Sequence, residues 1–300
     1  MERDPNRFRG CLLGLAVGDA VGTTVEFKPR GSFTGVTDMV GGGAFDLKAG
    51  QWTDDTSMAL CLATSLLVKS GFDPGDQMDR YWRWYQEGYL SSTGQCFDIG
   101  GTVSEALHRF RQTGDAFSGS TAPHKAGNGC LMRLAPVPMF YFPVLEKIVR
   151  FAAQSSRTTH GALECIESCR LFAEMLFRAL FGLKKNEILF NASVRLTAPK
   201  IRAIAEAGYR HKQVDQIRGT GYVVECLEAA LWCFYQTETF EDAILKAANL
   251  GDDADTTAAV CGQIAGAYYG ESGIPVQWLD RLFMRAEITG LADDLCEREV

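Results

Sequence analysis

Residues 257–270, TAAVCGQIAGAYYG, consist mainly of alanine, glycine, cysteine and threonine before Tyr268. An apolar run of this length and pattern predicts a helix, and its small side chains would let neighbouring helices approach closely. Residues 14–22, GLAVGDAVG, predict a second such helix with three glycines. A glycine inside a helix costs about 1 kcal/mol relative to alanine, so close packing is the expected reason for these three. Both stretches indicate tightly packed core helices.

Helical spacing of apolar residues predominates along the rest of the chain. It begins at Phe8 and predicts helices over residues 8–19, 58–68, 78–89, 103–110, 145–153, 163–180, 222–235, 240–248 and 257–269. Strand-like alternation is scarce, and residues 36–40 lie among glycines that favour a loop. The connections over 28–50 and 111–129 are long, which is typical of functional or disordered segments. The sequence predicts an all-α fold, a single compact multi-helix domain over residues 1–300.

The composition excludes several classes of protein. Hydrophobic residues make up 46% of the 300 residues and charged residues 22%, which is typical of globular chains and leaves ample apolar surface for a core. The 30 lysines and arginines against 37 acidic residues give a net charge of −7, which does not suit a duplex-binding surface. Apolar runs look shorter than the roughly 20 residues of a membrane span. Residues 1–9 are charged and lack the apolar core of a signal peptide. We expect a soluble, cytoplasmic monomer without nucleic-acid or membrane partners.

The ten cysteines also indicate a cytoplasmic protein. They include no CxxC pair, and most lie inside apolar helical patterns, as Cys61 and Cys261 do. A zinc site favours closely spaced pairs, and a secreted disulfide scaffold is usually a much shorter chain. We therefore expect reduced, buried thiols that act as small hydrophobic residues.

Two acidic segments near opposite ends of the chain carry the chemistry. Residues 50–58, GQWTDDTSM, and residues 250–258, LGDDADTTA, each precede an apolar helix. Helix capping explains either segment alone, since Thr and Asp are favoured at helix starts. Five aspartates exceed that need. If the two starts converge, each pair of charges about 4 Å apart costs roughly 4 kcal/mol at an effective dielectric of about 20. Two bound Mg²⁺ or Mn²⁺ ions, which prefer oxygen ligands, would offset that repulsion.

Five further positions are candidates for binding or catalysis. Asp19 lies on an apolar helix face, where burial is costly without a partner. Glu26 opens the glycine-rich connection and is either a solvated acid or a mobile functional one. Residues 127–129, Gly-Asn-Gly, followed by an expected helix start, form a natural anion cradle. His160 is more often a cap or surface residue in such a context, and Asp98 most simply caps the next helix.

The two acidic motifs, TDDT at 53–56 and DADT at 253–256, make the pattern resemble the ADP-ribosylglycohydrolase family. This family includes the dinitrogenase-reductase-activating glycohydrolases and the ADP-ribosyl-acceptor hydrolases, and the resemblance extends from residue 14 to residue 258. It implies an all-α fold with a dinuclear Mg²⁺ or Mn²⁺ centre. The metal ligands that it implies are Thr53, Asp54, Asp55, Asp253, Asp255 and Thr256.

The resemblance also implies roles for the remaining candidates. Glu26 corresponds to a mobile loop carboxylate near the scissile bond, and Asp55 acts in catalysis as well as metal binding. The positions around the diphosphate and distal sugar of ADP-ribose are Gly127, Asn128, Gly129 and His160. Asp98, in FDIG at 97–100, resembles the branch that removes ADP-ribose from arginine. Two departures are Asp252, where glycine is common, and the bulkier residues at 130–131.

The implied reaction is metal-dependent hydrolysis of the N-glycosidic bond between ADP-ribose and a modified side chain of a protein substrate, most simply arginine. Bound metals would hold the vicinal ribose hydroxyls and position a water. Three alternatives stay open: hydrolysis of serine-linked or O-acetyl-ADP-ribose, a dimetal phosphohydrolase, and a non-catalytic ADP-ribose-binding protein. The sequence does not separate direct displacement from a ring-opened route.

Overall fold

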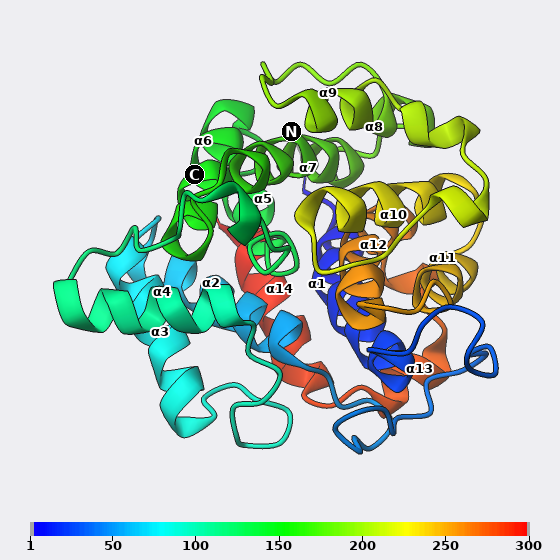
Figure 1. Cartoon of the computed structure of the whole chain (residues 1–300), viewed down its shortest axis with the longest axis horizontal. Helices are drawn as coiled ribbons and strands as arrows, with labels where there is room; N and C mark the ends of the chain where they lie inside the picture. Colours follow the sequence, from blue (N-terminus) through cyan, green and yellow to red (C-terminus); the bar gives the residue numbers. More distant parts are fainter. Residues whose placement is uncertain (1–2, 299–300) are drawn as a thin grey trace.

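Two long helices, α1 (Pro5–Gly22) and α12 (Ala254–Tyr269), lie side by side at the centre of the computed structural model (Figure 1), which describes residues 3–298. Every fourth residue of α1 from 10 to 22 is a glycine, and each faces the α12 backbone. A Cβ added to Gly18 would lie 2.1 Å from the Ala258 carbonyl oxygen, and one added to Gly14 would lie 2.3 Å from that of Gly262. The predicted close packing is confirmed, and it is a contact between two backbones.

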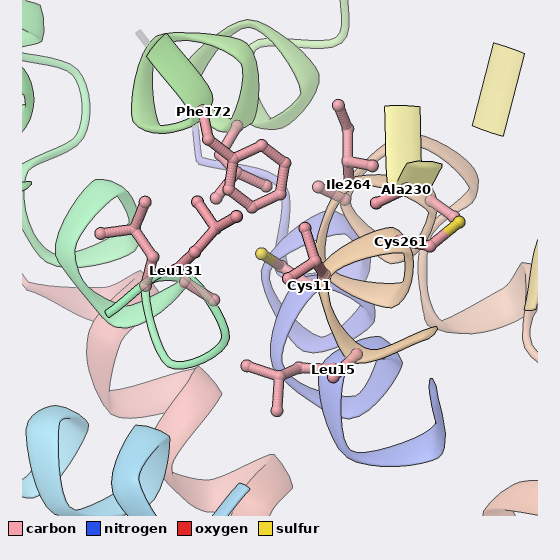
Figure 2. Packing of buried hydrophobic residues seen from close by; sticks show 14 of the residues in the cluster. Cys11, Leu15, Leu131, Phe172, Ala230, Cys261 and Ile264 are labelled. Atoms are coloured by element: carbon pink, nitrogen blue, oxygen red, sulfur yellow. The ribbon is translucent and has the colours of Figure 1, made fainter. Parts of the chain in front are cut away.

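Four other α-helices of the main core make the most extensive contacts with the central pair. These are α7 (Leu163–Leu180), α10 (Val223–Tyr235), α11 (Phe240–Ala248) and α14 (Arg285–Glu297). Figure 2 shows how their side chains meet: Cys11 and Leu15 of α1 lie near Cys261 and Ile264 of α12, with Phe172, Leu131 and Ala230 around them. Nine of the ten cysteines are buried, and Cys96 is half-buried.

A smaller hydrophobic cluster lies between α2 (Asp54–Lys69), α3 (Pro74–Glu87) and α4 (Gly101–Thr113). Helix α2 contributes to both clusters, through Leu60 to the main core and through Met58 to the smaller one. Helix α3 begins at an Asp73 N-cap and ends at Gly88 in the left-handed region. The shared helix α2 therefore joins the three-helix group to the main core.

The all-α prediction is confirmed, because residues 3–298 contain helices and isolated bridges but no strand. All nine predicted helices are present, including α6 (Leu145–Thr159). The prediction missed α14 and the short helices α5 (Pro136–Tyr141), α8 (Lys185–Leu189), α9 (Pro199–Ala205) and α13 (Val276–Arg281). Four of these have fewer than eight residues, too few to establish a helical period. The predicted single domain over 1–300 extends past the described residues at both ends.

One statement about apolar runs was wrong. The segment Pro5–Val25, which joins α1 to the short 3₁₀ helix η1 (Thr23–Val25), is long and apolar enough to cross a membrane by length and composition. However, 89% of its most apolar window is buried inside the protein. This is the environment of a core helix, and the packing against α12 accounts for it.

Candidate active site

The first turns of α2 and α12 meet at the end of the central helix pair. The Thr53 hydroxyl oxygen lies 3.1 Å from Asp255 Oδ2, and the Thr256 hydroxyl oxygen lies 3.3 Å from Asp55 Oδ2. These contacts join segments about 200 residues apart in the sequence, so the predicted convergence is observed. Neither N-cap side chain, Thr53 or Asp253, makes a capping hydrogen bond to its own helix. The capping interpretation of these two residues was therefore wrong.

Asp19 of α1 caps α2 from outside. Its buried carboxylate accepts hydrogen bonds from the backbone N–H and hydroxyl of Thr53, at 2.8 and 2.9 Å, and from those of Thr56, at 3.0 and 2.6 Å. The expected pairing of a buried Asp19 is confirmed, and it satisfies N–H groups that a helix start leaves free. The sequence did not assign Asp19 to the site. The signal that pointed to it was a carboxylate on an apolar helix face.

Two groups of three carboxylates could each hold a metal ion. Oxygens of Asp19, Asp55 and Asp255 lie within 4.8 Å of one another, and so do oxygens of Glu26, Asp98 and Asp255. Asp255 belongs to both groups. Three buried oxygens, Asp55 Oδ1, Asp255 Oδ1 and Glu26 Oε2, have no hydrogen-bond donor within residues 3–298. Buried acceptors without donors fit hard divalent cations, which prefer oxygen ligands.

Burial and mutual repulsion keep these carboxyls partly protonated without a cation. Burial is the largest cause in each case, followed by neighbouring carboxylates for most members of the cluster. The pKa of Asp19 is raised to about 6, that of Asp98 to about 7 and that of Glu26 to about 10. The pKa values of Asp54, Asp55 and Asp255 are raised well above their usual range. Two dications would offset this excess negative charge and favour the ionised forms.

A cavity of about 600 Å³ borders the second carboxylate group through Glu26 and Asp98, whereas Asp19, Asp55 and Asp255 lie behind its lining. Five of the predicted site residues from the acidic motifs and loops line it: Glu26, Asp54, Asp98, Asp253 and Thr256. Asp253 Oδ2 accepts a hydrogen bond of 2.7 Å from the side-chain amide of Asn128, which connects the start of α12 to the Gly-Asn-Gly loop. A cavity of this volume suits a small-molecule ligand.

Glu26 and Asp98 approach the cluster from two different loops. Glu26 is only 3% exposed, so its interpretation as a solvated loop acid was wrong. Asp98 has a φ of 57°, and Gly100 occupies the N-cap position of α4 without any contribution from it. The capping interpretation of Asp98 was therefore also wrong. The backbone turn directs this carboxylate toward Glu26 and Asp255 instead.

The backbone conformation of Asp252 explains why glycine is common at this position. Its φ is 56°, in the left-handed region where glycine is favoured. Its carbonyl accepts a hydrogen bond of 2.7 Å from the Phe27 N–H, and its N–H donates to the Lys28 carbonyl at 2.9 Å. These two bonds hold the Glu26 loop against the start of α12.

The Gly-Asn-Gly loop and His160 form another wall of the cavity. A Cβ on Gly129 would lie 2.9 Å from His160 Cε1, and one on Gly127 would lie 3.2 Å from Nε2. Glycine at both positions leaves room for the imidazole. His160 is 2% exposed, so the interpretation as a surface residue was wrong. It is the C-cap residue of α6, where its N–H donates to the Ser156 carbonyl, whereas Ala162 occupies the N-cap of the following helix α7. Burial lowers its pKa to about 4, and the ring is neutral at pH 7.

The loop differs from the prediction in one respect. No helix starts directly after it, since residues 129–133 form turns and α5 begins at Pro136. The bulkier residues that follow the loop, Cys130 and Leu131, are buried, and Leu131 points into the main core (Figure 2). They do not line the cavity.

Comparisons with known proteins agree with this geometry. Residues 1–300 match the family model described as ADP-ribosylglycohydrolase. The chain is 46% identical to ADP-ribosylarginine hydrolase Tri1 of Pseudomonas putida, over 99% of this chain and 80% of the relative. It is 31% identical to the ADP-ribosyl-[dinitrogen reductase] glycohydrolase of Rhodospirillum rubrum, over 94% and 92% of the two chains. A solved ADP-ribosylglycohydrolase-related protein complex matches with a TM-score of 0.86, 44% identity and 97% coverage of both chains.

Proposed function

Because the chain belongs to the ADP-ribosylglycohydrolase family, we propose that it hydrolyses the N-glycosidic bond between ADP-ribose and an arginine side chain of a modified protein. The observation that carries the proposal is the position of Asp98. Its carboxylate lies within 4.8 Å of Glu26 and Asp255 oxygens and lines the cavity, so an acid is available where a cationic acceptor would enter. A carboxylate pairs with a guanidinium through charge-assisted hydrogen bonds, which a serine hydroxyl cannot match.

Two divalent cations, Mg²⁺ or Mn²⁺, are the proposed cofactors. Asp19 and Asp55 would hold one ion, Glu26 and Asp98 would face the other, and Asp255 would contact both. Thr53, Thr256, Asp54 and Asp253 complete the oxygen-rich surroundings. When bound, such ions supply Lewis acidity toward ribose hydroxyls and a water.

The side chains of this protein provide the remaining functions. The Asp98 carboxylate lines the cavity, where it can pair with the guanidinium and guide a proton to the guanidine nitrogen that leaves the sugar. Glu26 is placed to orient the sugar or to accept a proton from water. Asn128 is fixed by Asp253, and the glycines on either side of it leave backbone exposed toward phosphate oxygens.

A second cavity supports a long ligand. It has a volume of about 830 Å³ and shares Thr102, Gly127 and Gly221 with the first. Its lining includes Lys125 and Lys200, whose positive charges balance the acidic end. ADP-ribose is a long molecule with a negatively charged diphosphate between two ribosyl units, so two adjacent cavities match its length and the two lysines supply positive charge for its phosphates.

The proposal is tested with defined substrates. The protein is incubated with peptides ADP-ribosylated on arginine or on serine, with O-acetyl-ADP-ribose and with ADP-ribose, in Mg²⁺, Mn²⁺ or EDTA, and the products are separated by chromatography. We expect metal-dependent release of ADP-ribose from the arginine peptide. Asp98→Asn should lower this rate roughly 100-fold or more, whereas the exposed control Asp79→Asn should not. AMP release without cleavage of the arginine bond would instead support a phosphohydrolase.

We also propose a cytoplasmic, monomeric protein. Buried cysteine thiols throughout the core suit a reducing compartment, and the small apolar side chains of the central helices are covered within the chain itself. Light scattering of the purified protein measures the mass, and fractionation of the source cells measures the location.

A further inference from the structure

Arg133 is a buried cation outside the acidic site. It is 0% exposed, and no carboxylate of residues 3–298 pairs with it. Its Nη1 donates to the Gly129 carbonyl at 2.9 Å, and its Nη2 donates to the Ser155 carbonyl at 3.2 Å. The guanidinium also lies 4.8 Å from the centroid of the Tyr81 ring. The end of α6, with its partial negative charge, and an aromatic face therefore stabilise this charge.

Two threonines at the end of α6 also accept from Arg133 Nη2. The distance is 2.7 Å to the Thr159 hydroxyl and 3.2 Å to the Thr158 hydroxyl. The Thr158 hydroxyl donates its proton to the Ser155 carbonyl at 2.8 Å. The Thr159 oxygen lies 2.9 Å from Nδ1 of His160. The two hydroxyls thus share a donor but differ in where their protons go.

The contact between Thr159 and His160 has a defined direction. A guanidinium can only donate, so the Thr159 oxygen accepts from Arg133 and keeps its own proton free to donate. Nδ1 of His160 is the acceptor beside it. If Nδ1 carried a proton, the Thr159 proton would have no other acceptor within residues 3–298, and a buried hydroxyl without an acceptor is unfavourable. The proton of the neutral ring therefore belongs on Nε2.

The Nε2 edge faces the cavity. His160 lines it, and Nε2 lies beside the position that a Cβ of Gly127 would occupy. Nε2 has no hydrogen-bond partner among residues 3–298. An N–H group at this edge can serve only an acceptor, such as a phosphate, carbonyl or hydroxyl oxygen.

We propose that Arg133 is a positioning residue that acts through Thr159 to fix His160 as the neutral Nε2–H tautomer, a permanent hydrogen-bond donor to an oxygen of the ligand in the cavity. That this oxygen belongs to ADP-ribose rests on the proposed function. The tautomer itself does not, because it follows from bonds present without ligand. Arg133 also donates to the Gly129 carbonyl, so one side chain fixes both the His160 ring and the glycine loop that the ring contacts.

The tautomer is measured by long-range ¹H–¹⁵N NMR of ¹⁵N-labelled protein without ligand, with His160→Gln used to assign the ring. We expect a roughly tenfold or larger excess of the Nε2–H form. Thr159→Val keeps the shape of the side chain and removes the hydroxyl, so the Nδ1–H form should rise. Thr159→Ser should restore the original signal. Thr158→Val is the matched control, since it removes a second hydroxyl bound by Arg133 and should leave the tautomer unchanged.

Binding is measured separately by titration with ADP-ribose. Thr159→Val should weaken binding roughly tenfold, and Thr159→Ser should not. A predominant Nδ1–H form in the native protein, or an unchanged tautomer in Thr159→Val, would overturn the relay. Arg133→Met removes the donor to the Thr159 oxygen, and a folded Arg133→Met protein with the native tautomer would exclude Arg133 from the relay. A normal relay in a protein that cleaves no ADP-ribosyl bond would leave this inference standing and refute the proposed function.

Discussion

Ionisation of Asp19 should weaken the metal-free fold, and the substitution Asp19→Asn removes that cost together with the repulsion between Asp19 and the carboxylates of Asp54 and Asp55. Burial raises the pKa of Asp19 from 3.8 to about 6, so its contribution to stability is present below about pH 4 and is lost as the pH rises through about 6. At about 1.4 kcal/mol per pH unit, the step from about pH 5 to about pH 8 costs the wild type about 1.4 kcal/mol. Asparagine does not titrate, so the variant avoids this cost.

The measurement is the free energy of unfolding from urea titrations of both proteins at the two pH values, in EDTA. We expect the stability of the wild type relative to Asp19→Asn to fall by at least about 1.4 kcal/mol as the pH rises, because Asp19 also raises the pKa of Asp54 and Asp55 in the wild type. His160 acts in the opposite sense, because its pKa is lowered to about 4 and its neutral form favours folding as the pH rises. Its effect is common to both proteins and cancels in the difference.

Divalent cations should reverse the result. Mg²⁺ or Mn²⁺ at about 100 times the dissociation constant measured at about pH 5 would stabilise the wild type by about 2.7 kcal/mol at that pH. The same metal concentration should stabilise it more at the higher pH, where protons no longer compete for the carboxylates. Asp19→Asn should gain much less. A relative stability that stays constant or rises with pH in EDTA would refute the cost of ionising Asp19. An equal gain of both proteins from the metal would refute the assignment of Asp19 to a cation site.

Further predictions concern packing and the cavity wall. Gly18→Ala should lower the free energy of unfolding by about 1–3 kcal/mol, because the added Cβ would meet the Ala258 carbonyl. Gly290→Ala in α14 should raise the free energy of unfolding by about 1 kcal/mol, because its Cβ would meet no atom within 4 Å. Urea unfolding measures both changes. Gly129→Ala should weaken ADP-ribose binding in a titration while the protein stays folded, since its Cβ would displace the His160 ring. Asp255→Asn should reduce bound metal from two ions toward none in elemental analysis after dialysis, because this carboxylate belongs to both groups.

Local patterns in the sequence predicted the helices well. They suggested a metal site at the acidic segments only on the assumption that the two segments converge. The small residues of 257–270 and the glycines of 14–22 predict close packing because steric fit depends on side-chain size alone. The partner of each helix depends on the whole chain, and the backbone contact between Gly18 and Ala258 could not be predicted from either stretch. The motifs at 53–56 and 253–256 identified the oxygen groups that could bind a metal, and only the fold showed that the two motifs meet.

The local explanations failed at residues whose environment is set by distant loops, although the family resemblance implies site roles for them. Glu26, Asp98 and His160 each have an ordinary local explanation, as a solvated acid, a cap and a surface residue. Glu26 and His160 are buried and Asp98 is half-buried, in each case by segments far along the chain. The bonds between the Glu26 loop and Asp252 are an example. Asp19 was noticed for the cost of burying it, but its bonds to α2 require the tertiary structure. The left-handed backbone at Asp98, which turns its carboxylate into the site, leaves no clear trace in the sequence.

The contact between α1 and α12 has a consequence for how this protein tolerates change. Main-chain atoms, whose radii are the same in every sequence, set the spacing between the helix that carries Asp19 and the helix that carries Asp255. Exchange of larger side chains elsewhere in the core can shift outer helices without altering that spacing. Diverged chains can therefore replace much of their interior and still keep Asp19 and Asp255 at the same separation, as long as the glycines of α1 are kept.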